Sequence, residues 1–391
     1  MQKQPEGAAR VVAVPAPARP RIRLRHDRIR LSVLFGAAVF AGYLLAGCAD
    51  EPPAPGPPAP SAAPLAVPAA GAYLGAYIDF GEAEDTVTLE AIEAYETLVG
   101  KHQAIIASSS FWGEESFPQK NLELIARHGA VPLVYWSPWD RPYSQSQPPD
   151  RFRLDAILAG TWDGYLDRWA DGARAYGRPI LVAWGLEMNG HWFPWSGCHY
   201  GGGTPAPAGG FAGPALYKAA FRHVVDRVRA RGAGNIQWVF HVNHLSFPAE
   251  PWNAFAQYYP GAQYVDWLGV SIYGKQFAAS DWLTFRQASE AAFRELAALD
   301  PSKPIMVAEF GVGEYPQAGS KADWLQEALA VMRDEQPRVK AAVYWHERWQ
   351  NADESYSNLR VNSSPAALAA FREQVSDPHW LPRPQLAPAS R

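Results

Sequence analysis

The sequence predicts a (β/α)8 barrel, in which eight parallel strands alternate with helices. Two observations lead to this prediction. Eight short apolar segments recur along residues 71–375, and helical segments with short connections separate them. The apolar segments are continuous rather than alternating, as expected for strands that are buried on both faces of a parallel sheet. Eight such repeats fit a closed barrel better than a doubly wound sheet.

Turn-forming residues bound each predicted strand and helix. The predicted strands are 72–78, 103–108, 131–136, 180–186, 236–242, 265–273, 304–310 and 339–345. The predicted helices are 89–99, 119–128, 162–176, 214–231, 281–299, 321–335 and 365–375, and the piece at 252–259 is short. Glycines follow several of these helices and prolines stand near two N-termini, which is the usual punctuation of helix ends.

Two glutamates stand where predicted strands end. Glu187 follows the fourth strand and Glu309 closes the seventh. The carboxyl ends of barrel strands meet at one rim, so we expect these two side chains to lie close together. One carboxylic acid and one carboxylate on rigid elements, surrounded by aromatic rings, are what glycoside hydrolysis requires. A single glutamate would be no more than a charged residue at the start of a loop.

The segments around these glutamates resemble glycoside hydrolase family 26. The resemblance rests on residues 187–190 (Glu-Met-Asn-Gly) with Trp192 and Trp195, on 132–139, on 258–269 and on 303–311, and it covers residues 71–371. It implies a retaining endo-hydrolase of β-linked polysaccharide, mostly β-1,4-mannan, with mixed-linkage β-glucan and β-1,3-xylan as other substrates. It also implies that Glu187 is the acid/base, Glu309 the nucleophile and Tyr273 the residue that orients the nucleophile.

One residue departs from the family pattern. The family usually has histidine directly before the acid, and this chain has Leu186. Leucine makes no hydrogen bond, so a contact that tightens at the transition state is lost. This keeps an alternative open, a non-catalytic or weakly active carbohydrate-binding barrel in envelope polysaccharide assembly. For catalysis we expect an apolar surround to keep Glu187 protonated and hydrogen bonds to keep Glu309 ionised.

Further side chains near strand ends are predicted to contact substrate. Aromatic rings there can stack on pyranose faces, and polar groups can bind sugar hydroxyls. The aromatic candidates are Trp136, Trp139, Trp192, Trp195 and Trp345, and the polar ones are Asn189, Asn243, His244, His346 and Glu347. His241 and His244 are three apart at a strand end, where side chains need not converge, so we expect no metal at this rim and no cofactor.

The conformation of three long loops decides whether the cleft is an open groove or a closed pocket. These loops are 138–150, 196–213 and 245–256. The second contains the glycine- and proline-rich stretch 201–210, which is either a mobile rim or an inert surface insertion. Endo or exo action, the sugar and its linkage depend on these loops.

The first 47 residues resemble a bacterial lipoprotein signal. Six arginines between residues 19 and 30 precede an apolar stretch at 31–45, and Cys48 follows small residues at the expected cleavage point. The apolar stretch is shorter than the ~20 residues of a membrane-spanning helix, which disfavours an uncleaved anchor. We therefore expect lipidation at Cys48, a Pro/Ala-rich tether at 48–70, the catalytic domain at 71–375 and a Pro-rich tail at 376–391. Aspartate directly after the lipidated cysteine would favour retention at the inner membrane. This chain lacks it, so we expect the protein at the outer membrane or cell surface.

Charge and cysteine content exclude other classes. The full chain has a net charge of −4, and residues 1–47 contain eight Lys/Arg and two acids, so the remainder carries about −10. An acidic chain of this kind is not a nucleic-acid binder, and its membrane attachment depends on lipid chains. Cys198 is the one other cysteine of the chain, so no disulfide is expected within the fold. We expect a monomer.

Overall fold

A closed barrel of eight parallel strands is the centre of the computed structural model, which describes residues 63–81, 84–141, 151–351 and 354–388. Each strand pairs in parallel with the next along the chain, and β1 pairs with both β2 and β8, which closes the sheet. The strands are β1 (Ala72–Ile78), β2 (Ile105–Phe111), β3 (Val131–Ser137), β4 (Ile180–Trp184), β5 (Ile236–Asn243), β6 (Trp267–Tyr273), β7 (Ile305–Gly311) and β8 (Val339–His346). The predicted (β/α)8 architecture is confirmed.

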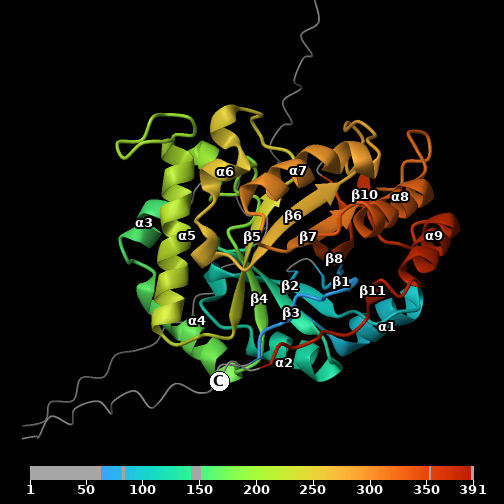
Figure 1. The fold of residues 1–391 in the computed structure, drawn as a ribbon, viewed down its shortest axis with the longest axis horizontal. Coiled ribbons are helices and arrows are strands. Elements are labelled where there is room, and N and C mark those ends of the chain that lie inside the picture. Colours follow the sequence, from blue (N-terminus) through green and yellow to red (C-terminus); the bar gives the residue numbers. More distant parts are fainter. Residues whose placement is uncertain (1–62, 82–83, 142–150, 352–353, 389–391) are drawn as a thin grey trace, which may run out of the picture.

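Helices surround the barrel, with α5 on one side and α8 and α9 on the other (Figure 1). They are α1 (Leu89–Val99), α2 (Gln119–His128), α3 (Leu154–Leu158), α4 (Asp163–Tyr176), α5 (Ala212–Ala230), α6 (Phe255–Tyr258), α7 (Phe285–Leu299), α8 (Lys321–Asp334) and α9 (Pro365–Val375). Short 3-10 turns are η1 (Trp112–Glu114), η2 (Gly197–Tyr200), η3 (Pro251–Asn253) and η4 (Ala262–Tyr264). All seven predicted helices are present.

Side-chain caps set several of the helix ends. Thr88 accepts a hydrogen bond from the backbone of α1. Thr284 and Gln287 form a capping box, which explains why α7 begins at Phe285, four residues after the predicted start. Helix α3 was not predicted, because five residues are too few to show a helical period.

Segments on both sides of the predicted catalytic domain pack against the barrel. The strand β11 (Trp380–Leu381) pairs in parallel with β1, and Leu65 pairs with Leu386 in an isolated bridge. The described parts of the predicted tether and tail therefore contact each other and the barrel wall. A small hairpin of β9 (Arg348–Gln350) and β10 (Tyr356–Asn358) follows β8.

The predicted signal, with Cys48, lies outside the described residues. Within the part of the chain that the structure describes, no helix is both long enough and apolar enough to cross a membrane.

Candidate active site

Glu187 stands in a turn just beyond β4. The strand stops at Trp184, two residues before the predicted end, because Gly185 turns the backbone into the left-handed region with φ of 55°. Glu187 itself has φ of 53°, which is uncommon for a residue with a side chain and occurs where function holds a strained backbone. Its backbone N–H donates to the His241 carbonyl at 2.7 Å, which fixes the turn against β5.

Glu309 lies on β7 and receives a hydrogen bond from Tyr273 at the end of β6. The Tyr273 hydroxyl donates to Oε2 of Glu309 at 2.7 Å, which is the contact that the family resemblance implies. Only 6 % of Glu309 and 7 % of Glu187 is exposed, so both carboxyls are largely removed from water.

Ser271 on β6 links the two carboxyls. A hydrogen bond from its hydroxyl lowers the pKa of Glu187 and that of Glu309, so the hydroxyl stands near both carboxyls and can donate to either one. A register shift between Val270 and Ser271 places Ser271 opposite Glu309 across β6 and β7, and such irregularities often re-aim side chains beside active sites.

His241 on β5 orients the Ser271 hydroxyl. Nε2 of His241 is 2.7 Å from Oγ of Ser271. Burial lowers the pKa of His241 to about 3, so the ring is neutral. For Ser271 to donate to a carboxylate, Nε2–H of His241 must donate to Oγ, which leaves Nδ1 as a lone pair. Nδ1 is buried and finds no hydrogen-bond partner among the described residues, so no neighbour opposes this tautomer.

Both glutamates hold protons more tightly than ordinary carboxyls. Burial raises the pKa of Glu187, and its bonds from Ser271 and Trp192 oppose this. Burial and the charge of Glu187 raise the pKa of Glu309 well above its usual range, against the lowering effect of Tyr273. We predicted that hydrogen bonds keep Glu309 ionised; in the free protein burial and repulsion outweigh them. The pair therefore favours one bound proton, which Glu187 must carry for the two roles to separate.

One of the predicted tryptophans contacts Glu187, and another packs against aromatic rings of neighbouring strands. Nε1 of Trp192 donates to Oε2 of Glu187 at 2.7 Å. Trp345 on β8 stacks on Tyr77 of β1 with ring centroids 3.8 Å apart, and its ring lies 6.0 Å from that of Tyr135. Substrate contact by Trp192 and Trp345 stays a prediction.

The other three predicted tryptophans belong to the core, and their assignment to sugar stacking is wrong. Trp136 is 0 % exposed and stacks on Trp169 of α4, with centroids 4.0 Å apart. Trp139 and Trp195 are also buried, and they pack edge to face against each other. Strand side chains alternate, so Trp136 points outwards to the helices while its neighbour Tyr135 points into the barrel.

Asn189 and Asn243 hold loops together, which corrects their prediction as sugar ligands. Both side chains are buried. Nδ2 of Asn189 donates to the Asn243 carbonyl at 2.9 Å, and its Oδ1 accepts from the Asn243 backbone at 2.9 Å. Nδ2 of Asn243 in turn donates to the Leu245 carbonyl at 2.7 Å. The loop after β5 is thereby tied to the turn that carries Glu187.

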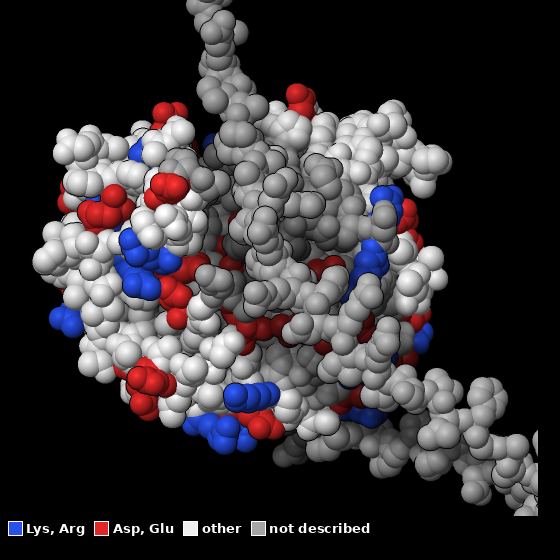
Figure 2. Space-filling view, turned by 180° about the vertical axis from the view of Figure 1, so that it is seen from behind, with Lys and Arg blue, Asp and Glu red and all other residues white. Residues whose placement is uncertain are grey.

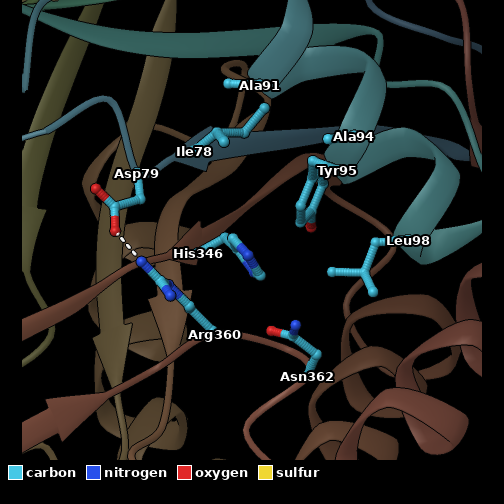
Figure 3. A pocket seen from close by; sticks show the side chains of 9 residues that line it. All are labelled: Ile78, Asp79, Ala91, Ala94, Tyr95, Leu98, His346, Arg360 and Asn362. Atoms are coloured by element: carbon cyan, nitrogen blue, oxygen red, sulfur yellow. Dashed lines mark hydrogen bonds and ion pairs between the residues drawn. The ribbon is translucent and has the colours of Figure 1, made fainter.

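His346 points outwards, away from the inner face on which Trp345 lies, and its prediction as a subsite residue is corrected. Figure 3 shows it in a pocket of about 440 Å³ together with Tyr95 of α1 and the ion pair of Asp79 and Arg360. Nδ1 of His346 accepts from the Val361 backbone at 3.1 Å. As with Trp136, the alternation along a strand decides the direction.

His244 and Glu347 are partly buried and remain predictions for substrate contact. Nδ1 of His244 lies 3.1 Å from the Ser271 carbonyl and can donate to it, which leaves Nε2 as an acceptor. Burial lowers the pKa of His244 to about 4. Glu347 accepts from Nε1 of Trp345 at 2.7 Å, and burial together with Glu84 raises its pKa to about 8.

Sequence reasoning missed several residues around the pair. Ser271, His241, Tyr135 and Tyr77 were not predicted, although the period-two alternation along each strand would have separated inner from outer positions. Glu84, which follows β1, was missed because no strand ends at it; its charge raises the pKa of both Glu309 and Glu347.

Acidic side chains mark one face of the molecule. Figure 2 shows this face hollowed near its centre, with Asp and Glu side chains gathered in the hollow. Such a surface repels polyanions and offers acceptors for the hydroxyl groups of a neutral glycan. Among the described residues, the group of side chains with metal-ligand spacing lies elsewhere, at Glu96, His102 and His128.

Comparisons with known proteins point to one family. The model of glycosyl hydrolase family 26 matches residues 143–319. Endoglucanase H of Acetivibrio thermocellus is 31 % identical over 309 residues, which cover 78 % of this chain and 30 % of that protein. A mannan endo-1,4-beta-mannosidase of Bacillus subtilis is 24 % identical over 265 residues, covering 66 % of this chain and 61 % of that protein. The chain thus spans less than two thirds of either relative.

Solved structures share the fold. The catalytic domain of the family 26 endo-beta-1,4-mannanase of Bacillus sp. JAMB-750 superposes with a TM-score of 0.57 at 20 % identity, covering 80 % of this chain and 87 % of that one. The family match and the relatives show that the (β/α)8 domain, which carries the paired glutamates, is similar to known glycoside hydrolases. Together they support glycosyl hydrolase family 26 for this chain.

Proposed function

We propose that the barrel is a retaining, endo-acting glycoside hydrolase that cleaves a β-linked polysaccharide by double displacement. One observation supports this most strongly. The charge of buried Glu187 raises the pKa of buried Glu309, the Ser271 hydroxyl lowers the pKa of both, and Glu309 accepts a hydrogen bond from Tyr273. A retaining reaction needs carboxyls that are only ~5 to 5.5 Å apart, and the effect of the Glu187 charge on the pKa of Glu309 supports such a short separation.

In the first step Glu187 acts as the acid and Glu309 as the nucleophile. Glu187 gives its proton to the glycosidic oxygen while an oxygen of Glu309 attacks the anomeric carbon. The bond between that carbon and the glycosidic oxygen breaks, and the leaving chain departs with the proton. Tyr273 holds the attacking carboxylate in place, and Trp192 holds Glu187.

In the second step the roles of Glu187 reverse. Now a carboxylate, it takes a proton from water, whose oxygen attacks the anomeric carbon and displaces Glu309. The sugar leaves with its original anomeric configuration, and Glu187 is protonated again. The buried surround that raises the pKa of Glu187 suits both roles, because a catalytic acid/base works best when its pKa lies near the working pH.

For the substrate we propose a β-glucan first and β-1,4-mannan second. The sequence resemblance favoured mannan, but the relative that is 31 % identical is an endoglucanase, whereas the mannosidase is 24 % identical. Trp345, which stacks on Tyr77, is the ring that we expect to contact a pyranose in either case.

A reducing-end assay tests the proposal. The purified chain is incubated with barley β-glucan, glucomannan, galactomannan and β-1,3-xylan, and product lengths are followed by chromatography. We expect new reducing ends on at least one substrate, with mid-length products first, as endo cleavage gives. Glu295→Gln is a control, because Glu295 accepts from the Phe255 backbone N–H, away from the pair, and should leave turnover unchanged. Oligosaccharide binding without any new reducing end would favour the non-catalytic alternative.

We propose further that the protein is exported and lipid-anchored at Cys48. The support is the basic segment, the apolar stretch 31–45 and the cysteine that follows small residues. In a Gram-negative host, labelled palmitate should enter the wild type and Cys198→Ser, and Cys48→Ser should lose the label and move to the soluble fraction. Label that persists in Cys48→Ser would contradict the anchor.

A further inference from the structure

Three potential metal ligands meet at the side of the barrel remote from the paired glutamates. They are Glu96 on α1, His102 between α1 and β2, and His128 at the end of α2. One ligand atom from each lies within 4.8 Å of the others. The active-site glutamates stand at the carboxyl ends of strands, whereas these residues flank the start of β2. No feature of the proposed hydrolysis uses them.

The contacts within this group leave one nitrogen unpartnered. Nδ1 of His102 is 2.6 Å from Oε2 of Glu96, and Nε2 of His128 is 3.0 Å from Oε1. The second pair has the distance of a hydrogen bond but not its geometry: Nε2 of His128 is buried and finds no hydrogen-bond partner among the described residues. The His128 side chain is only 9 % exposed, so water does not readily satisfy it. A cation between nitrogen and carboxylate would satisfy both.

We propose that Glu96, His102 and His128 bind a divalent transition-metal ion of the zinc class. Two imidazoles and a carboxylate are ligands that zinc prefers, and a tetrahedral site with three protein ligands takes water as the fourth. Ligand atoms on such an ion are separated by roughly 3.3 Å, close to the 3.0 Å between His128 and Glu96. The His102 ring must move slightly away from Glu96 to reach this separation, and its side chain, which is 51 % exposed, has room to move.

Glu96 is already oriented for this role. Its Oε1 accepts a hydrogen bond from the Gln103 backbone at 2.8 Å, which fixes the carboxylate as outer partners of metal ligands do. The exposed side of His102 leaves room for the water ligand. Because the three ligands come from α1, the following loop and α2, the ion would join two neighbouring helices across β2 and act on stability rather than on catalysis.

Zinc titration of the metal-free protein tests the proposal. After chelator treatment, calorimetry should show one zinc ion bound per chain. At zinc a hundredfold above its dissociation constant, the unfolding midpoint should rise by roughly 4 °C. His102→Ala and His128→Ala should each weaken zinc binding at least tenfold and abolish most of the rise. His102 is half exposed, so its variant should fold even if that of His128 does not.

A matched control separates this site from ordinary histidine–carboxylate pairs. His223 of α5 lies 2.7 Å from Asp163 of α4, and His223→Ala should bind zinc as the wild type does. Absence of zinc binding by the wild type, or equal binding by the wild type and both ligand variants, would overturn the proposal. Hydrolysis by His102→Ala should stay unchanged, so the metal site and the proposed hydrolase activity can fail separately.

Discussion

Replacing Tyr273 by phenylalanine removes the hydroxyl that donates to the proposed nucleophile and little else. That hydroxyl lies 2.7 Å from Oε2 of Glu309. A hydrogen bond to a charged group contributes about 1.5–3 kcal/mol, so its loss should lower kcat/KM by roughly 10- to 150-fold. Because the bond from Tyr273 lowers the pKa of Glu309, its removal should raise that pKa further. The acid limb of the kcat/KM profile should then move to higher pH.

The assay is initial-rate hydrolysis across pH with a soluble glycan. Tyr176→Phe is the matched control, because its hydroxyl donates to the Leu122 carbonyl at 3.1 Å between helices of the outer layer. The control loses a comparable bond but should keep both the rate and the pH profile. If Tyr273→Phe leaves the rate and the acid limb where they are in the wild type, Tyr273 does not act on the nucleophile and the reasoning is refuted.

Four further predictions concern the same site. Glu187→Gln and Glu309→Ala should each lower kcat by at least roughly a thousandfold in a reducing-end assay, and wild-type rates in either would refute the assignment. Ser271→Ala should cost roughly 10- to 100-fold in kcat/KM and raise the apparent pKa of the pair; an unchanged pH profile would show that the hydroxyl does not reach the carboxyls. Trp345→Ala should raise KM roughly tenfold, and an unchanged KM would remove this ring from the substrate site. The pKa of Glu347 is raised to about 8 in the folded protein, so the stability of the wild type relative to Glu347→Gln should fall as the pH rises from about 4.5 to about 8. Thermal unfolding across pH measures this, and a stability difference that does not change with pH would contradict the raised pKa.

The barrel could be predicted because its signal is carried by whole segments. Strands buried on both faces read as continuous apolar runs, and glycine after a helix marks its end, as Gly100 does after α1. The glutamates could be placed because strand order alone brings the ends of strands four and seven to one rim. Neither inference requires a side-chain direction.

Side-chain direction is where the sequence was insufficient. A tryptophan near a strand end reads the same whether it faces the barrel axis, as Trp345 does, or a helix, as Trp136 does. The link between Ser271 and the two carboxyls depends on a register shift in β6, which no local pattern records. The positive φ of Gly185 likewise ends β4 before the predicted end of the strand. The sequence did contain a sign of this, because Gly185 is a glycine inside an apolar run.

The central claim is that Glu309 forms a covalent bond to the sugar while Glu187 supplies and recovers the proton. Trapping with a 2-fluoro glycoside, which slows the second step, followed by mass spectrometry of peptides, tests it most directly. We expect one sugar per chain, attached to the peptide that contains Glu309, and the attachment should be absent in Glu309→Ala. A label on another residue, or active turnover with inverted products and no adduct, would contradict the account.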